Sequence, residues 1–597
     1  MKNEDKFIGQ VDKDIKTSLE HKSSKQAEWE DEHKCYIGDP WNLSFMDKSF
    51  DRRKKRPASS DNIIFPAVEY KKYVLTANTP DTVVRVLTPQ IGDDGELDDQ
   101  SKMLTNVVES VFYKNEYSMI WTRTILQGLM HGMLIGRVGY DGEVVGGQGE
   151  DRYIGEVDIS YIKKDDFFAD PNVDDWERNL QECEYVAERQ TKPISWFKKK
   201  YPDKAHLVTP DEDFVDANNR DNAYLYMYYH KGEPKEVPSE WKETFKDKME
   251  RSDNILSKKK YEGYKDGDLE GVHLAMYADG VLLEYIPYIY DDGMYPFAFK
   301  VIHVDEDNQW GFGEIKNMIQ PQVLLNKVDE MEAEAYSKQG LGGYFYQKGA
   351  VNPQQKKNWT ENNHKGGSLI EVDWKDGIEP MQPTQVPNSI FNYKSYKYNM
   401  AGEVAGYTNI QKGDAKSGTP WKAIKDLGTR ADTRTVGLIR KAEMFHREIV
   451  ELVISRIKQF YTGKRMFIGF ENNVPFKMAF EPNNIKQQWE REVQGEEVTE
   501  TYYPEMDIRV NIVDAKPTER EYYINLANMM HDRGLIDRQS YHETIESGKL
   551  PPKEVILERL REQEQQQMQA LQQEQMAQSQ PNLGVPNQEF TYEDLNR

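Results

Sequence analysis

The longest regular pattern in the chain lies between Trp421 and Thr462, a run that contains no proline. Apolar residues recur there at alternating steps of four and three, which is the spacing of a helix with one wide apolar face. Gly428 and Gly437 each cost a helix interior about 1 kcal/mol relative to alanine, so we expect the helix to bend near them. The apolar face consists of two neighbouring stripes: Leu438, Ala442, Phe445, Ile449 and Leu452, and beside them Val450, Val453, Ile457 and Phe460.

Two shorter helices are predicted ahead of this run. Apolar residues at helical spacing predict a helix over residues 314–338, which starts or kinks at Pro321. An aromatic segment, residues 388–410, follows a turn-rich stretch with two short strand candidates, residues 340–387. Residues 411–420 then form a glycine-containing break before the long helix.

The remaining residues predict a mixture of strands and helices, and therefore an α+β fold. Residues 273–285 predict a β-hairpin, because Asp279 and Gly280 suit a type I′ turn between alternating strands. Further helices are expected over residues 1–35, 99–135, 176–190 and within 517–562, and further strands over residues 134–145, 154–161, 223–230, 295–304, 464–470 and 501–514.

Composition narrows the class of protein. A chain of 597 residues is too long for one hydrophobic core, so we expect several packed regions. No apolar run approaches the roughly 20 residues that span a bilayer, and the first residues lack the apolar stretch of a signal peptide. Cys35 and Cys183 stand far apart without CxxC spacing, which indicates a reducing compartment and no disulfide framework.

The charge of the chain bears on nucleic-acid binding. A formal net charge of −24 argues against a protein that grips nucleic acid with a basic surface. It is compatible with a protein past which DNA must slide. Residues 51–58, DRRKKRPA, form a basic patch in this acidic chain, either a solvated loop or a contact for a phosphate or an acidic partner.

No motif makes a positive case for catalysis. Residues 413–419 have the glycine spacing of a phosphate-binding loop but lack its lysine, and residues 542–546 lack the second histidine of a zinc-protease motif. An EF-hand over residues 305–316 fails because Trp310 replaces the required glycine. The acidic stretch DDFFADP, residues 165–171, is interpreted as a turn that anchors its phenylalanines, and His446 as structural. We expect no catalytic residue, no metal site and no cofactor.

The order of these elements resembles that of the portal proteins of tailed bacteriophages, in their podovirus-like branch. The resemblance covers roughly residues 60–560. Its most specific stretch runs from GFGEI and IQPQVLLN through AGYTNIQKG to TPWKAIKDLGTRADTRTVGLIRK, and DDFFADP adds to it.

The resemblance implies a multidomain portal fold that forms a ring. Its expected parts are a wing over residues 1–310, a first stem helix over 311–339, a small β-rich clip over 340–387, a second stem helix over 388–410, a tunnel loop over 411–420, a long kinked helix with return strands over 421–515, a helical crown over 516–562 and a glutamine-rich tail over 563–597.

The resemblance also implies which residues face DNA. In this family the tunnel loop enters the channel, which here corresponds to Gln411, Lys412, Gly413, Asp414, Ala415, Lys416, Ser417, Gly418, Thr419 and Pro420. Lys422 and Lys425 follow as additional cations of the lumen.

The implied function is that of a conduit for double-stranded DNA, during packaging and during ejection. The implied location is a capsid vertex of the virion, after assembly in the cytoplasm of the bacterial host. The implied partners are further copies of the chain in a dodecameric ring, double-stranded DNA bound without sequence preference, the terminase large subunit, head-to-tail adaptor and tail proteins, and the major capsid protein, with no membrane.

The residue pattern supports a ring on separate grounds. The long helix and the two-helix stem expose more apolar surface than one chain covers, and head-to-tail repetition around a closed axis would cover it. Two other classes stay open. One is a ring-forming virion scaffold or adaptor without a DNA channel. The other is a carboxylate- or metal-dependent hydrolase, for which the sequence offers no cluster.

Overall fold

The structure is a computed structural model that describes residues 2–45, 61–77, 80–87, 94–147, 152–211, 214, 221–231, 271–341, 344–349, 351–354, 356–357, 378–380, 388–406, 421–461, 463–471, 474–481, 487–493, 496–502, 505–511, 517–533, 535–547, 556 and 559–561. The chain forms two compact units, residues 1–512 and 513–597.

The core of the first unit lies between two antiparallel sheets. One has five strands in the order β4-β5-β6-β7-β8, and the other has three in the order β3-β2-β9. Phe167, Phe299 and Trp310 belong to the buried aromatic cluster that joins them. The strands are β2 (Met133–Gly146), β3 (Tyr153–Tyr161), β4 (Phe167–Ala169), β5 (Tyr185–Pro193), β6 (Asn222–Lys231), β7 (Val272–Ala278), β8 (Val281–Tyr290) and β9 (Phe297–Val301).

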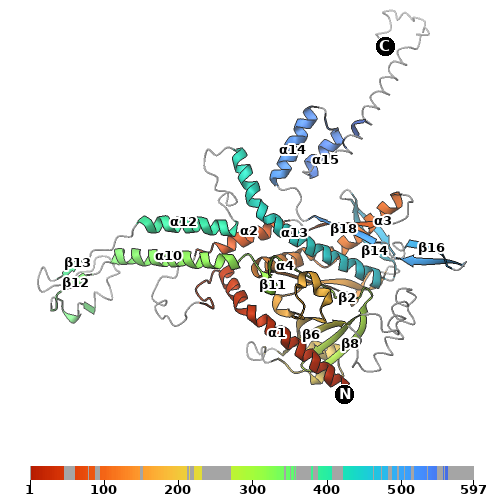
Figure 1. Ribbon diagram of the computed structural model, residues 1–597, viewed down its shortest axis with the longest axis horizontal. Helices are drawn as coiled ribbons and strands as arrows, with labels where there is room; N and C mark the ends of the chain where they lie inside the picture. The colour runs from red at the N-terminus through yellow and green to blue at the C-terminus, as the bar shows by residue number, and fades with distance from the viewer. Residues whose placement is uncertain are drawn as a thin grey trace, which may run out of the picture. The chain divides into compact units, whose positions relative to one another are not determined.

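Helices cover these sheets (Figure 1). The predicted N-terminal helix is α1 (Lys2–Ile37), and its Val11 and Ile15 pack with Phe168 and Tyr285 of the five-stranded sheet. The other helices of the unit are α2 (Ile64–Thr76), α3 (Asp94–Lys114), α4 (Tyr117–His131), α5 (Trp176–Asn179), α6 (Ile194–Lys200), α10 (Lys316–Leu341), α12 (Asn388–Ala405) and α13 (Trp421–Phe460).

The remaining strands form antiparallel pairs. Strand β1 (Asp81–Leu87) pairs with β18 (Glu505–Asn511), which brings together segments more than 400 residues apart. The other pairs are β10 (His303–Asp305) with β11 (Asn308–Phe312), β12 (Tyr344–Tyr346) with β13 (Ile378–Pro380), β14 (Arg465–Glu471) with β15 (Val474–Phe480), and β16 (Gln487–Val493) with β17 (Glu496–Tyr502).

The second unit contains α14 (Pro517–Asp532) and α15 (Arg538–Ser547), with the predicted break at Gly534 between them. The Tyr541 hydroxyl lies 2.9 Å from Asn528 Oδ1 and joins the two helices. Arg559 pairs with Glu543 at 2.9 Å.

The predicted hairpin is confirmed in its turn geometry. Asp279 and Gly280 have φ angles of 47° and 73°, both in the left-handed region that a type I′ turn requires.

Two helix predictions are wrong. The helix expected over residues 99–135 is divided at Glu116, whose φ is 50°, and it ends at His131. Gly132 then takes the left-handed C-terminal position, and the apolar residues after it begin a buried strand. The helix expected over residues 176–190 is limited to α5 and one 3₁₀ turn, because from Tyr185 onward the chain pairs with both β4 and β6.

The long helix α13 runs without interruption from Trp421 to Phe460, so its two glycines do not break it, and Figure 1 shows it bending along its length. Its predicted apolar stripes are buried apart from Phe460, which is half-buried. Phe445 and Ile449 pack against β2 at Gly136, where an added Cβ would lie 3.0 Å from either side chain.

This packing corrects the expectation that the long helix lacks a partner within its own chain. The described part of its apolar face is covered by β2 and β9 of the same chain. The apolar face of the long helix is therefore no argument for a ring, and an argument for a ring has to rest on other elements.

The start of α10 is fixed by a close backbone crossing. Gly132 has φ +99°, and a Cβ on it would lie 2.4 Å from the backbone of Phe312. A Cβ on Gly313 would lie 2.4 Å from the carbonyl oxygen of Met130. The Glu314 amide donates to the Leu129 carbonyl at 2.8 Å. The glycines of GFGE therefore let the end of β11 pass against the end of α4 before α10 begins.

The Glu314 side chain locks this crossing to two other elements. Lys71 Nζ of α2 lies 2.6 Å from one carboxylate oxygen, and His303 Nε2 of β10 lies 2.9 Å from the other. Burial by itself would raise the pKa of Glu314, but the hydrogen bond to His303 and the charge of Lys71 outweigh it and lower the pKa to about 2.

We predict that Gly313→Ala destabilises the first unit by about 2 kcal/mol or more, because the new methyl group meets backbone rather than a movable side chain. Gly437→Ala is the matched control. It lies within α13 with no atom within 4 Å of the added Cβ, and it should stabilise by about 1 kcal/mol. Thermal unfolding of both variants checks this. Equal melting temperatures for Gly313→Ala and wild type would contradict it.

We predict that Glu314→Gln loses stability above pH 4.5. The pKa of Glu314 is lower in the folded chain than its ordinary value of 4.5, so its stabilisation is present above pH 4.5 and disappears as the pH falls toward 2. The difference from wild type, about 3 kcal/mol at pH 7, should narrow over that range. Denaturant unfolding at several pH values measures it, with the exposed Glu306→Gln as control. A difference that does not change with pH would refute the role of this carboxylate.

Candidate functional site

Helices α10 and α12 lie side by side and are joined at one end by the β12–β13 pair (Figure 1). Both were predicted. Helix α10 runs from Lys316 to Leu341 rather than from Glu314 to Lys338, and it continues through Pro321 without a break. Helix α12 begins at Asn388 as expected but ends at Ala405 rather than Ile410.

Buried amides fix the first turns of α10. The Gln322 side-chain oxygen accepts from the Ile63 amide at 3.0 Å, and its nitrogen donates to the Asp61 carbonyl and to Asn326 Oδ1, both at 2.9 Å. Gln322 and Asn326 stand four residues apart on one helix face and are buried. The polar positions of IQPQVLLN thus bind the segment that leads into α2.

An ion pair joins the two helices farther along. Lys394 Nζ of α12 lies 2.6 Å from Asp329 Oδ1 and 3.2 Å from Glu332 Oε2 of α10. The hydrogen bond to Asp329, followed by that to Glu332, raises the pKa of Lys394. Because Asp329 is buried, loss of Lys394 would leave an unpaired carboxylate between the helices.

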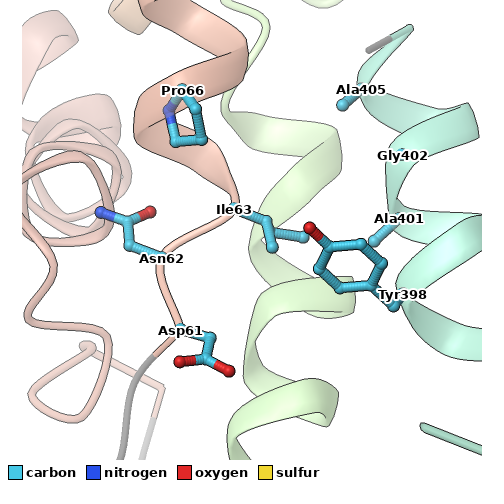
Figure 2. A pocket seen from close by; sticks show the side chains of 8 residues that line it. All are labelled: Asp61, Asn62, Ile63, Pro66, Tyr398, Ala401, Gly402 and Ala405. Carbon is cyan, nitrogen blue, oxygen red and sulfur yellow. The ribbon is translucent and has the colours of Figure 1, made fainter. Parts of the chain in front are cut away.

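A pocket of about 310 Å³ separates the start of α2 from the last turns of α12 (Figure 2). Ala401, Gly402 and Ala405 leave this space because their side chains are small. On the other side lie Ile63 and Pro66.

Helix α12 presents an apolar stripe to solvent. Tyr393, Tyr396, Met400 and Val404 follow one another at steps of three and four, and they are 45%, 57%, 38% and 42% exposed. A polar face with Asn392, Ser395 and Asn399 lies beside the stripe. On α10, Leu324 and Met331 are 38% and 60% exposed. These side chains remain uncovered by the described part of the chain.

The predicted tunnel loop, Gln411–Pro420, lies outside the described residues. It follows α12 and precedes α13 in the chain. Lys422 and Lys425 fall in the first turns of α13, and their side chains are also outside the description. The basic patch at residues 51–58 and the charged stretch 232–270 are outside it as well.

The acidic stretch DDFFADP has the anchoring role that was predicted. Phe167 and Phe168 are fully buried, and Asp166 accepts from Arg189 Nε at 3.0 Å. His446 is also structural, as predicted. It is completely buried, with its ring nitrogens 2.8 Å from Thr82 Oγ1 and 2.9 Å from the Tyr117 hydroxyl, and burial lowers its pKa to about 3.

The residues that position α10 were missed by the sequence analysis. GFGEI and IQPQVLLN were recognised, but Lys71, which binds Glu314, and Ile63, which binds Gln322, lie about 240 and 260 residues away in the chain. The segment that carries the exposed stripe of α12 was recognised as aromatic and assigned to the second stem helix, but its exposed positions were not identified.

Among the described residues, no group of His, Cys, Asp and Glu side chains is arranged to hold a metal ion. None of the described helices combines the length and apolar character that crossing a membrane requires.

A model of the phage P22-like portal protein family matches residues 13–590, nearly the whole chain. A search of curated proteins found no match. The chain therefore belongs to the P22-like portal protein family, whose members are non-enzymatic proteins of the phage head vertex and serve as the conduit for DNA.

Proposed function

We propose that copies of this chain close into a dodecameric ring through contacts between neighbouring stems, where α10 and α12 are the stem helices. The exposed stripe of Tyr393, Tyr396, Met400 and Val404 is the observation that supports this most directly. Taking such a side chain from full exposure to full burial is worth about 1.5–3 kcal/mol. Because these four are about half exposed, each would contribute roughly half of that value, and together they would supply a substantial contact.

The stripe has a complementary surface on the same pair of helices. Leu324 and Met331 of α10 are also exposed apolar side chains. Packing of the α12 stripe of one subunit against α10 of the next is a heterologous contact, and such contacts close into rings when the rotation matches. The ion pair of Lys394 with Asp329 would hold α10 and α12 in the same relative orientation in every subunit. Each subunit could then meet the next at the same angle.

In this ring the tunnel loop, residues 411–420, faces the DNA. The copies of Lys412 and of Lys416 from all the subunits would form two circles of positive charge around the channel of an otherwise acidic protein. One lysine–phosphate contact in water is worth only about 1 kcal/mol at close range, and salt screens it. Weak contacts of this kind touch passing DNA without arresting it. Lys422 and Lys425 extend the same positive region.

The clip, residues 340–387, provides the binding surface for the terminase large subunit and later for the head-to-tail adaptor and tail proteins. Its support is the β12–β13 pair at the end of the stem helices. The remaining parts follow the family: a wing over residues 1–310 that meets the major capsid protein, return strands within 421–515, a crown over 516–562, a tail over 563–597, and assembly in the cytoplasm of the bacterial host.

We predict that Tyr396→Glu reduces ring formation, because it places a charge in the middle of the stem contact. Asn399→Glu is the matched control, since it adds the same charge to the polar face of α12. Mass photometry and end-on electron micrographs measure the assembly. Rings of equal yield from both variants would exclude the stripe as the contact, and a monodisperse wild-type monomer would exclude the ring itself.

We predict that the double variant Lys412→Glu, Lys416→Glu forms normal rings but alters DNA packaging or retention, because the loop then repels phosphate. Lys412→Arg, Lys416→Arg keeps the charge and serves as control. Packaged DNA per head is the readout. Normal packaging and full retention with the glutamate variant would show that the loop does not face DNA. Rings that lack a channel altogether would favour an adaptor role.

We predict that deletion of residues 350–378 leaves rings intact and abolishes adaptor binding. Co-sedimentation of purified rings with the adaptor measures this. If the deletion variant forms no rings, residues 350–378 are instead part of the folded core, and the prediction is wrong.

A further inference from the structure

A second, larger pocket lies in the first unit, away from the stem. It has a volume of about 620 Å³ and is formed by α1, α4 and the turn after β3. Trp29, Leu126 and Met130 line its apolar part. Trp29 is 2% exposed and packs edge-on against Trp310, so this part of the pocket belongs to the core.

Cations surround the apolar part. Arg123 of α4, Lys34 of α1, and Lys163 and Lys164 of the turn all line the pocket, against two carboxylates, Glu30 and Asp165. Lys164 pairs with Asp165 at 2.8 Å and also lies 5.0 Å above the Trp29 ring. Arg123 and Lys163 are exposed and form no ion pair with any residue that the structure describes. The pocket therefore has an excess of positive charge in a chain of net charge −24.

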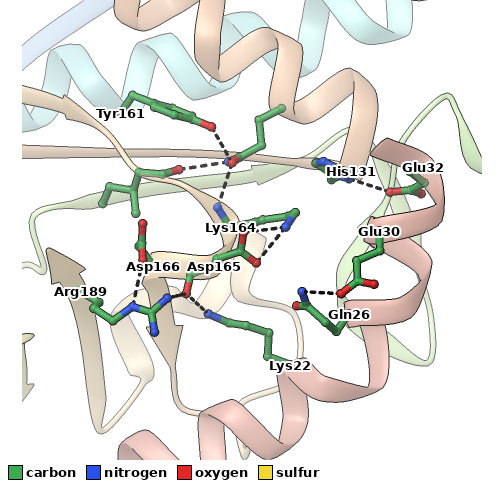
Figure 3. Close-up of polar contacts among 12 residues, drawn as sticks. Lys22, Gln26, Glu30, Glu32, His131, Tyr161, Lys164, Asp165, Asp166 and Arg189 are labelled. Carbon is green, nitrogen blue, oxygen red and sulfur yellow. Dashed lines mark hydrogen bonds and ion pairs between the residues drawn. The ribbon is translucent and has the colours of Figure 1, made fainter. Parts of the chain in front are cut away.

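The turn that presents the lysines is held rigidly. Gln127 of α4 accepts from the Lys164 amide at 2.9 Å and from the Tyr161 hydroxyl at 2.8 Å, and it donates to the Ile162 carbonyl at 3.1 Å. Figure 3 shows Lys164 and Tyr161 converging on this point. A turn with three such hydrogen bonds needs little reorganisation to bind a ligand.

Further buried contacts support the walls (Figure 3). Lys22 Nζ and Arg189 Nη2 both donate to the Asp165 carbonyl, at 2.9 and 3.2 Å. His131 also lines the pocket, and its Nδ1 lies 2.8 Å from Glu32 Oε2. Burial raises the pKa of Glu32 and lowers that of His131, so the pair has no net charge at neutral pH in either placement of its proton. It therefore does not cancel the positive charge of the rim.

We propose that this pocket binds an acidic peptide segment of a partner protein, with one aromatic or large aliphatic side chain packed in the apolar part of the pocket at the partly exposed Leu126, and flanking carboxylates at Arg123 and Lys163. The volume suits one or two side chains. A small, rigid concavity with apolar and cationic parts is the arrangement expected for such an anchor.

Nucleic acid fits these observations less well. Phosphate binding uses cations spaced along a backbone and needs no buried apolar floor. Here the cations surround one hollow, and Trp29 is too buried to offer an open stacking surface for a base.

The test uses the full-length protein and a fluorescein-labelled peptide, Asp-Glu-Phe-Glu-Asp, with fluorescence anisotropy as readout. We expect saturable binding that is weakened about tenfold or more by Arg123→Glu with Lys163→Glu. The matched control, Lys198→Glu with Lys199→Glu, changes the same number of charges on exposed residues of α6 and should bind as wild type does. A peptide with alanine in place of phenylalanine should bind about tenfold more weakly.

Three results would overturn the proposal. The first is absence of saturable binding, or equal binding by both double variants. The second is that the protein binds a 20-base-pair DNA duplex, that Arg123→Glu with Lys163→Glu abolishes this binding, and that the peptide does not displace the duplex. This result would make the pocket a nucleic-acid site. The third is loss of rings in that variant by mass photometry, which would make it a subunit contact. Ring formation is measured separately, so failure of the proposed assembly and failure of this site remain distinguishable.

Discussion

The backbone crossing of Gly132 against Phe312 and of Gly313 against Met130 sets the start and direction of α10. No larger residue fits at either glycine without movement of the opposing backbone. Glu314 then binds Lys71 and His303, and Gln322 binds the residues before α2. The residues before α2, α2 itself and β10 therefore converge at the start of α10. In the proposed ring, these contacts would give α10 the same direction in every subunit.

The packing of α13 changes how assembly should be explained. Its long apolar face meets β2 and β9 within the chain, so it stabilises the subunit rather than the ring. The uncovered apolar surface lies instead on α12, beside a helix to which α12 is tied by Lys394. Folding of the chain thus uses the apolar face of α13, whereas the association proposed above would use a different helix face, on α12. In that proposal, the contact on α12 can be altered without unfolding the core.

Patterns that depend on local geometry were predictable from the sequence. The helical period over 421–460, the type I′ turn at Asp279-Gly280 and the order of two helices around a short β pair all follow from neighbouring residues. Strand β5 was not predictable, because its helical composition is overridden by pairing on both edges. The roles of Glu314, Gln322 and Gln127 depend on partners distant in sequence or on a turn whose shape only the fold defines. The sequence indicated exposed apolar surface on the two-helix stem, but which residues of α12 are exposed could be found only once its packing against α10 was known. The tunnel-loop lysines, which the sequence singled out, lie outside the described residues.

The most direct test of the central claim is a cryo-electron microscopy reconstruction of the purified full-length protein. The expected result is a closed ring, a dodecamer by the family's precedent, in which Tyr393, Tyr396, Met400 and Val404 of one subunit pack against α10 of the next and α13 packs on β2 and β9 of its own subunit. A ring in which this stripe faces solvent, or in which α13 packs on a neighbouring subunit instead, would contradict it.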